Sequence, residues 1–185
     1  MTNKKFLTGL IFLLLITGAG WLWFISGNLN TAPPVTFRML DGRQINLKNF
    51  QGRPVLITFW ATTCISCMKE MPHLISLYND MSVKGLEIIG VAMAYDPPNQ
   101  VLDVTKRRHI PYLVSLDIDG SIAKAFDNVI LTPTTFLISQ DGKIIRHNTG
   151  EIDITALRQQ ISNLLSQQSK VENKKPEIAI NDSNV

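Results

Sequence analysis

Three short runs of the chain are almost continuously apolar. They cover residues 55–60, 86–94 and 134–139, and runs of this length are typical of strands that are buried on both faces of a sheet. Residues 64–79 follow the first run and repeat apolar side chains every three or four positions, which predicts a helix. Pro72 lies inside this helix, where it removes one backbone donor and predicts a kink.

Two hairpins are predicted, one on either side of this arrangement. Asp-Gly pairs, which are strong turn signals, occur at residues 41–42 and 141–142. Strands that alternate with helices between these hairpins predict an α/β domain with a parallel central sheet and antiparallel edges. The expected elements around the turns and between the apolar runs are strands over 36–40, 44–47, 112–116 and 143–147, and helices over 99–108, 121–126 and 153–165.

The N-terminal segment has the pattern of a transmembrane anchor. Residues 6–26 contain no charged side chain, and a helix of that length rises roughly 31 Å, which matches the apolar core of a bilayer. Lys4 and Lys5 precede the segment, and the next basic residue is Arg38. The positive-inside rule therefore predicts a cytoplasmic N-terminus and a domain on the outer side of the membrane.

A cleaved signal peptide is the alternative, because residues 17–19 resemble a small-residue cleavage site. The apolar run continues beyond that point, which favours a retained anchor, and both alternatives export the domain to an oxidising compartment. The expected organisation is a cytoplasmic stub and anchor over 1–27, a linker over 28–35, a folded domain over 36–166 and a disordered polar tail over 167–185.

The length and composition of the chain predict one folded domain with one hydrophobic core. The chain has 185 residues and a formal net charge of +3, and about 130 residues remain for a folded domain, enough to bury a core. Basic residues are scattered except at Lys106-Arg107-Arg108. A run this short is typical of a solvated helix face, so no nucleic-acid partner is expected.

The two cysteines of the chain, Cys64 and Cys67, begin the helix that follows the first apolar run. On the first turn of a helix, side chains three positions apart lie close enough for their sulfurs to bond. Unpaired backbone N–H groups and the helix dipole stabilise a thiolate on the first cysteine. Cys64 is therefore the candidate nucleophile, and Cys67, one turn deeper, is the candidate resolving thiol.

Two simpler roles for the pair are less favoured. A zinc site needs four protein ligands or three with water, and His73, His109 and His147 show no ligand spacing, so no metal is expected. A purely structural disulfide would close a very short loop and constrain the unfolded chain little. Thiol–disulfide chemistry that needs no cofactor is the favoured hypothesis.

Four motifs around the cysteines form a specific combination. They are Val55-Leu56-Ile57-Thr58-Phe59-Trp60-Ala61-x-x-Cys64-x-x-Cys67, Glu70-Met71-Pro72, Thr132-Pro133-Thr134-Thr135-Phe136-Leu137-Ile138 and Asp141-Gly142-Lys143. Together they resemble the membrane-anchored thioredoxin-like proteins of the TlpA/ResA family over roughly residues 34–165. The resemblance implies a thioredoxin fold after one N-terminal transmembrane helix, and thiol–disulfide oxidoreductase activity outside the bacterial cytoplasmic (inner) membrane, facing the periplasm or cell exterior.

The resemblance also implies partners. Substrates would be thiols or disulfides of exported proteins, for example apocytochrome c before haem attachment or copper-site proteins. The electron donor would be a membrane thiol-transfer protein of the CcdA/DsbD type.

Individual site residues follow from the same resemblance. Pro133 matches the family's cis-proline, which faces the disulfide, and Thr132 would present its backbone to a substrate strand. Glu70 matches a partly buried glutamate that could accept the proton of Cys67 if burial raises its pKa. A solvated glutamate that stabilises the helix dipole is the alternative for this position.

Residues next to the cysteines complete the expected substrate-binding set, which is Trp60, Thr63, Ile65 and Ser66. For Trp60, burial in the core is an equal alternative. The sequence departs from the family's pattern here, since Thr58 stands where thioredoxins have an acidic residue and Ile65-Ser66 replaces a proline-containing pair. The residues between the cysteines influence thiolate stability and redox potential, so the direction of electron flow stays open.

The leading functional hypothesis is a protein-disulfide reductase, and the same residues running in reverse would make a thiol oxidase. A peroxidase of the peroxiredoxin type is disfavoured, because Ala61 stands where that family has threonine. A non-enzymatic copper-binding or redox-responsive module is a further alternative, since copper(I) favours paired thiolates, but no Met- or His-rich site accompanies the pair.

Overall fold

The computed structural model describes residues 14, 17 and 31–172, with side chains as far as residue 166. The predicted anchor over 1–27 lies outside this part of the chain, apart from Leu14 and Thr17, which are helical. None of the helices in the described part is both long and apolar enough to cross a membrane. The chain divides into a unit over 1–31 and a compact unit over 32–185, and the fold below is that of the second unit.

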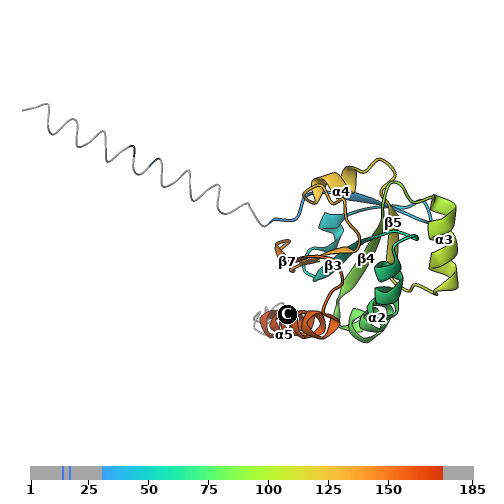
Figure 1. Cartoon of the computed structure of the whole chain (residues 1–185). Helices are drawn as coiled ribbons and strands as arrows, with labels where there is room; N and C mark the ends of the chain where they lie inside the picture. Colours follow the sequence, from blue (N-terminus) through green and yellow to red (C-terminus); the bar gives the residue numbers. More distant parts are fainter. Residues whose placement is uncertain (1–13, 15–16, 18–30, 173–185) are drawn as a thin grey trace, which may run out of the picture. The chain divides into compact units, whose positions relative to one another are not determined.

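A seven-stranded mixed sheet organises the compact unit (Figure 1). Its spatial order is β2-β1-β5-β4-β3-β6-β7. The central strands β3, β4 and β5 are parallel, while β1, β2, β6 and β7 add antiparallel pairs at both edges, as the alternation of elements predicts. The strands are β1 (Thr36–Met39), β2 (Gln44–Asn46), β3 (Val55–Trp60), β4 (Glu87–Ala92), β5 (Leu113–Leu116), β6 (Thr134–Ile138) and β7 (Ile144–Thr149).

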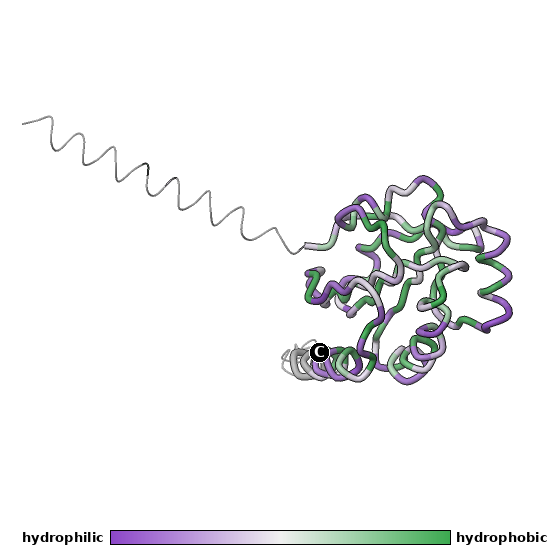
Figure 2. Tube along the Cα trace, viewed as in Figure 1, coloured by the Kyte–Doolittle hydropathy of each residue, from purple (hydrophilic) through white to green (hydrophobic). Residues whose placement is uncertain are grey.

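Helices cover both faces of this sheet (Figure 1). One face packs against α2 (Ile65–Met81), α3 (Pro98–Arg107) and α5 (Ile154–Glu172), and it contains Cys67, so we call it the disulfide face. The opposite face packs against α4 (Ser121–Ala125) and the 3-10 helix η1 (Leu47–Phe50), and its centre is a cluster of phenylalanines, so we call it the aromatic face. Apolar residues follow the strands through the middle of the domain, and polar residues predominate on the outer side of α3 (Figure 2).

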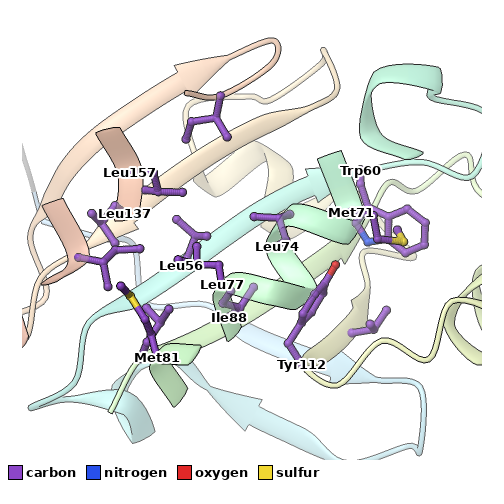
Figure 3. Close-up of a cluster of buried hydrophobic side chains, with 14 of the residues drawn as sticks. Leu56, Trp60, Met71, Leu74, Leu77, Met81, Ile88, Tyr112, Leu137 and Leu157 are labelled. Carbon is purple, nitrogen blue, oxygen red and sulfur yellow. The ribbon is translucent and has the colours of Figure 1, made fainter. Parts of the chain in front are cut away.

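The apolar run of β3 contributes to both faces because successive side chains of a strand point to opposite sides. Leu56 and Trp60 lie in the disulfide-face cluster, and Ile57 and Phe59 lie in the aromatic-face cluster. Every residue of β3 is buried. Figure 3 shows side chains from β3, β4, β6, α2 and α5 packed together in the disulfide-face cluster. The first cysteine follows the end of this fully buried strand, which gives the dithiol a rigid support.

Several element boundaries differ from the predicted ones. The final helix continues to Glu172, so residues 167–172 are helical rather than part of a disordered tail. The predicted linker over 28–35 ends early, because Val35 is buried in the aromatic-face cluster and the Ala32 N–H donates to the Gly142 carbonyl. The short helix η1 was not predicted, since its signal is a polar cap, in which the Asn46 side chain accepts the Lys48 N–H.

Candidate active site

The two cysteines form a disulfide at the point where β3 leads into α2. Cys64 is the N-cap residue of α2, and the Cys67 backbone N–H donates to the Cys64 sulfur over 3.2 Å. Cys67 is only 4% exposed, whereas Cys64 is half-buried. After reduction, an N–H donor at a helix N-terminus favours the thiolate of Cys64, and incoming groups reach that sulfur more easily than the sulfur of Cys67.

Of the two residues between the cysteines, Ile65 lies at the surface and Ser66 is half-buried. Ile65 is 73% exposed, and the Ser66 hydroxyl lies 3.5 Å from the Cys64 sulfur. Thr63, immediately before the pair, is also exposed. These three residues thus surround the more accessible sulfur, which is the location expected for residues that contact a substrate.

A second segment reaches the same end of the sheet from β6. The Thr132–Pro133 peptide bond is cis, the state that the resemblance implies for this proline. Phe59 pairs with Thr134 in the antiparallel β3–β6 ladder, so Pro133 lies next to the end of β3, from which the chain continues to Cys64. The Thr134 hydroxyl donates to the Leu131 carbonyl over 2.8 Å and holds this loop against the start of β6.

Exposed apolar side chains are concentrated on this loop. Ile130 is 72% exposed and Leu131 is 61% exposed. Both also line a cavity of about 120 Å³ beside β6 and β7. Ile65 is likewise exposed, so both segments that reach this end of the sheet, the start of α2 and the loop before β6, carry exposed apolar side chains, and exposed apolar surface is a mark of interaction sites.

Trp60 does not belong to this surface. Its exposed fraction is 4%, and it lies in the disulfide-face cluster between α2 and the sheet (Figure 3). Its indole occupies the space above Gly90, where an added Cβ would approach the Trp60 Nε1 atom to 3.1 Å and the Tyr112 ring to 3.3 Å. The assignment of Trp60 to substrate binding is therefore wrong, and the alternative of core burial is correct.

Glu70 lies on α2 one turn beyond Cys67 and is 6% exposed. Its Oε1 atom accepts the Ile152 N–H over 3.0 Å. Burial raises the pKa of Glu70 above its ordinary value, while the Ile152 hydrogen bond opposes part of that rise. The alternative of a solvated glutamate is excluded, and the raised pKa makes this carboxyl group a better proton acceptor than an ordinary glutamate.

A buried carboxylate that sequence reasoning missed lies on the other side of the cysteine segment. Asp96 is 5% exposed, and its Oδ2 atom accepts the Thr62 N–H over 2.6 Å. Its Oδ1 atom accepts the Thr62 hydroxyl. The available signal was its position, since Asp96 follows the apolar run of β4 and precedes Pro97 and Pro98, and side chains at the carboxyl ends of neighbouring parallel strands meet at one edge of the sheet.

Comparison with known proteins agrees with this geometry, since residues 28–165 match the Redoxin family. The chain belongs to that family. A thiol-disulfide oxidoreductase ResA of Bacillus cereus is 34% identical over 160 residues, which cover 82% of this chain and 91% of the relative. The ResA of Bacillus subtilis is 33% identical over 119 residues, covering 64% of this chain and 65% of that protein.

Solved structures of other redoxin-like proteins share the fold. A putative thioredoxin from Neisseria meningitidis has a TM-score of 0.70 and 31% identity, covering 80% of this chain and 98% of that one. A putative thiol:disulfide interchange protein DsbE from Chlorobium tepidum has a TM-score of 0.68 and 25% identity, covering 74% of this chain and 96% of that one. This redoxin is therefore a thioredoxin-fold thiol–disulfide oxidoreductase of the TlpA/ResA type.

Proposed function

We propose that this redoxin reduces disulfides of exported proteins through the Cys64/Cys67 dithiol. The observation that carries the proposal is the difference between the two sulfurs. Cys64 is half-buried and accepts a backbone N–H at the start of α2, whereas Cys67 is buried beneath it. One sulfur is thus equipped to attack a large partner, and the other is kept from it until the first has reacted.

The reaction begins with the reduced dithiol. The Cys64 thiolate attacks one sulfur of a substrate disulfide, forms a mixed disulfide and releases the other substrate sulfur as a thiolate. Cys67 then loses its proton, and its thiolate attacks the Cys64 sulfur and releases the second substrate thiolate. The substrate gains two electrons, the chain is left with the Cys64–Cys67 disulfide, and a donor dithiol must restore it.

Glu70 is the proposed proton acceptor for Cys67. It lies one helical turn further along α2, and burial raises its pKa. A group with a pKa closer to neutral exchanges protons more effectively at physiological pH than an ordinary glutamate. Thr58, which stands where thioredoxins have an acidic residue, has a hydroxyl that accepts a hydrogen bond from Thr135 and supplies no carboxylate.

Trapping of the mixed disulfide tests the order of attack. In Cys67→Ser, the first step proceeds and the second cannot, so a disulfide-linked adduct with a disulfide-containing substrate protein should accumulate on non-reducing gels. Cys64→Ser is the matched control and should form none. If neither variant forms an adduct, or if Cys64→Ser traps more than Cys67→Ser, the assignment of nucleophile and resolving thiol is wrong.

The apolar surface at Ile65, Ile130 and Leu131 is the proposed docking site for substrate proteins, with the backbone of Thr132 pairing to the bound strand. Leu131→Ser should lower kcat/KM for a protein disulfide by about tenfold, since each 1.4 kcal/mol of lost transition-state binding is one factor of ten. It should leave the rate with a small-molecule disulfide unchanged. Val83→Ser, at an 86% exposed position in the 3-10 helix η2 (Ser82–Lys84), is the matched control.

The direction of electron flow is tested by the reduction potential of the pair. A potential near that of thioredoxin, roughly −270 mV, would support a reductant. A value close to roughly −120 mV, as in a strong periplasmic oxidase, would make the chain a thiol oxidase instead. The Ser66 hydroxyl, 3.5 Å from the Cys64 sulfur, favours this second candidate to some degree, because a donor that stabilises the thiolate raises the potential.

We further propose that the domain is held outside the bacterial inner membrane by the uncharged segment 6–26, and that a membrane thiol-transfer protein of the CcdA/DsbD type supplies its electrons. The support is the charge pattern of the sequence, with Lys4 and Lys5 ahead of the apolar segment. Fusion of alkaline phosphatase to the C-terminus should give active enzyme in membrane pellets. An inactive fusion would contradict export, and active enzyme in the soluble fraction would indicate cleavage.

The proposed substrates include oxidised apocytochrome c and copper-site proteins. The reduced, purified domain should return the disulfide of an apocytochrome c haem-binding peptide to its thiols. Equal rates with an unrelated peptide disulfide would indicate a general reductase and contradict this choice of substrate.

A further inference from the structure

Asp96 fastens the segment that leads into the disulfide. Its side chain accepts both the backbone N–H and the hydroxyl of Thr62, two residues before Cys64. The Cys64 N–H in turn donates to the Ala61 carbonyl over 3.1 Å. The short turn that delivers Cys64 to the start of α2 is therefore anchored to a buried carboxylate.

The anchor belongs to the turn between β4 and α3. The Asp96 N–H donates to the Met93 carbonyl over 2.9 Å, and the Met93 N–H donates to the Trp60 carbonyl over 3.1 Å. The β4–α3 turn thus contacts the cysteine segment at two points, once at Trp60 and once at Thr62. Two contacts from one rigid turn fix the direction in which the chain leaves β3.

Among the described residues, no basic side chain contacts the Asp96 carboxylate. Its contacts are with Thr62, and the Thr62 hydroxyl also lies 3.3 Å from the Gln100 amide oxygen. The start of α3 has no charged residue before Asp103, and the loop over 129–133 has none. From α2, the buried ionisable group is Glu70, a second carboxyl group. The Asp96 carboxylate therefore binds the chain two residues before Cys64, and the contacts that offset its charge are the two hydrogen-bond donors of Thr62.

We propose that Asp96 is a positioning residue for the reaction proposed above, and that its negative charge opposes the Cys64 thiolate and so keeps the dithiol more reducing. A negative charge nearby disfavours a thiolate. When the thiolate is less stable, the reduced state is less stable relative to the disulfide, and the pair gives up electrons more readily. Asp96 would thereby offset the stabilisation that the helix N-terminus gives to the same sulfur.

Asp96→Asn tests the charge and retains the shape of the side chain. The amide oxygen can still accept the Thr62 N–H, and the amide nitrogen can donate to the Thr62 hydroxyl. We expect the equilibrium constant of the pair with a reference dithiol to shift about tenfold towards the reduced protein, which is about 30 mV for a two-electron couple. The Cys64 pKa, measured by thiolate absorbance, should fall in the same variant.

Thr62→Val separates the charge from the geometry. It removes the hydroxyl donor but leaves the carboxylate, so the charge is less offset and the potential should move in the opposite direction, with a rise in the Cys64 pKa. A purely structural role would shift both variants the same way. Asp117→Asn is the matched control, since Asp117 is a buried carboxylate that accepts the N–H groups of Ile122 and Ala123 in α4, and the potential should not change.

The proposed function and the role of Asp96 fail in different experiments. If the unaltered domain forms no reversible disulfide, the proposed function fails. If it does, but folded Asp96→Asn retains its potential, or Asp117→Asn shifts it equally, the role of Asp96 is refuted. If Asp96→Asn does not fold, Thr62→Val decides alone, and an unchanged or higher potential would refute the inference.

Discussion

The two faces of the central sheet differ in how each holds a buried carboxyl group, Asp117 on the aromatic face and Glu70 on the disulfide face. On the aromatic face, Asp117 accepts two backbone N–H groups at the start of α4. On the disulfide face, Glu70 accepts the single Ile152 N–H, and burial raises its pKa. The single backbone donor does not offset the effect of burial on Glu70, so this carboxyl group binds a proton more easily than an exposed glutamate does.

This contrast assigns different tasks to the two faces. The aromatic face is centred on Phe59, Phe126 and Phe136, with ring centroids 5.0 to 6.0 Å apart, and its buried carboxylate caps a helix. The disulfide face contains Cys67, and its buried carboxyl group lies one turn away on the same helix. We therefore expect substitutions on the first face to affect stability alone, and substitutions on the second to affect proton and electron exchange.

The largest expected effect is on stability and comes from Phe59→Ala. The side chain is fully buried in β3 and contacts two other rings, so its removal should lower the free energy of unfolding by about 3–5 kcal/mol. The reduction potential of the remaining folded protein should be unchanged. Denaturant unfolding and thiol equilibration measure the two quantities, and a shifted potential would mean that the faces are not independent.

Asp117→Ala should have the next largest effect. Two buried N–H groups of α4 lose their acceptor, and the expected loss of stability is about 1–3 kcal/mol. A loss of stability in thermal or denaturant unfolding, together with intact activity, would support a purely structural role. A loss of activity at full stability would contradict the division between the faces.

Glu70→Gln should change the dependence of stability on pH. The pKa of Glu70 is raised in the folded state. Its contribution to the stability of the wild-type protein is therefore fully present below the ordinary pKa of 4.5 and is lost as pH rises through the folded-state pKa. The glutamine can still accept the Ile152 N–H but does not titrate. The stability of wild type relative to the variant should therefore fall with rising pH, and a difference that rises instead would contradict a raised pKa.

The smallest effect is expected for Arg158→Gln. Arg158 on α5 pairs with Asp80 on α2 over 2.7 Å, and both side chains are substantially exposed. Exposed pairs of this kind contribute at most about 1 kcal/mol and are screened by salt. The variant should lose less than that in unfolding experiments, and the loss should vanish in high salt. A larger loss would show that the α2–α5 contact on the disulfide face depends on this pair.

The sequence predicted the elements whose signals are local. The hydrophobic run of β3, the Asp-Gly hairpin turns and the helical spacing of α2 each determine structure within a few residues, and all were confirmed. The cysteine pair was equally clear, because the chain has no other cysteine and the motif begins a helix.

The features that sequence reasoning missed depend on contacts between distant segments. Asp96 and Thr62 lie 34 positions apart, and they meet because β3 and β4 are neighbouring parallel strands whose ends lie at the same edge of the sheet. Trp60 was ambiguous because its burial depends on the space left by Gly90 on the neighbouring strand. The exposed pair Ile130 and Leu131 had no periodic pattern, and only the β3–β6 ladder shows that their loop lies next to the end of β3, which leads to Cys64.

That ladder also has a consequence for how the protein is made. Thr58 in β3 meets its hydrogen-bond partner Thr135 in β6 only across 77 positions of sequence. At about 5–20 residues per second, synthesis takes roughly 4–15 seconds to cover that distance. For most of that interval both cysteines have left the ribosome's catalytic centre without the strand that will flank them. Newly made chains are thus open to exchange with foreign disulfides before they acquire the structure that controls their own thiols.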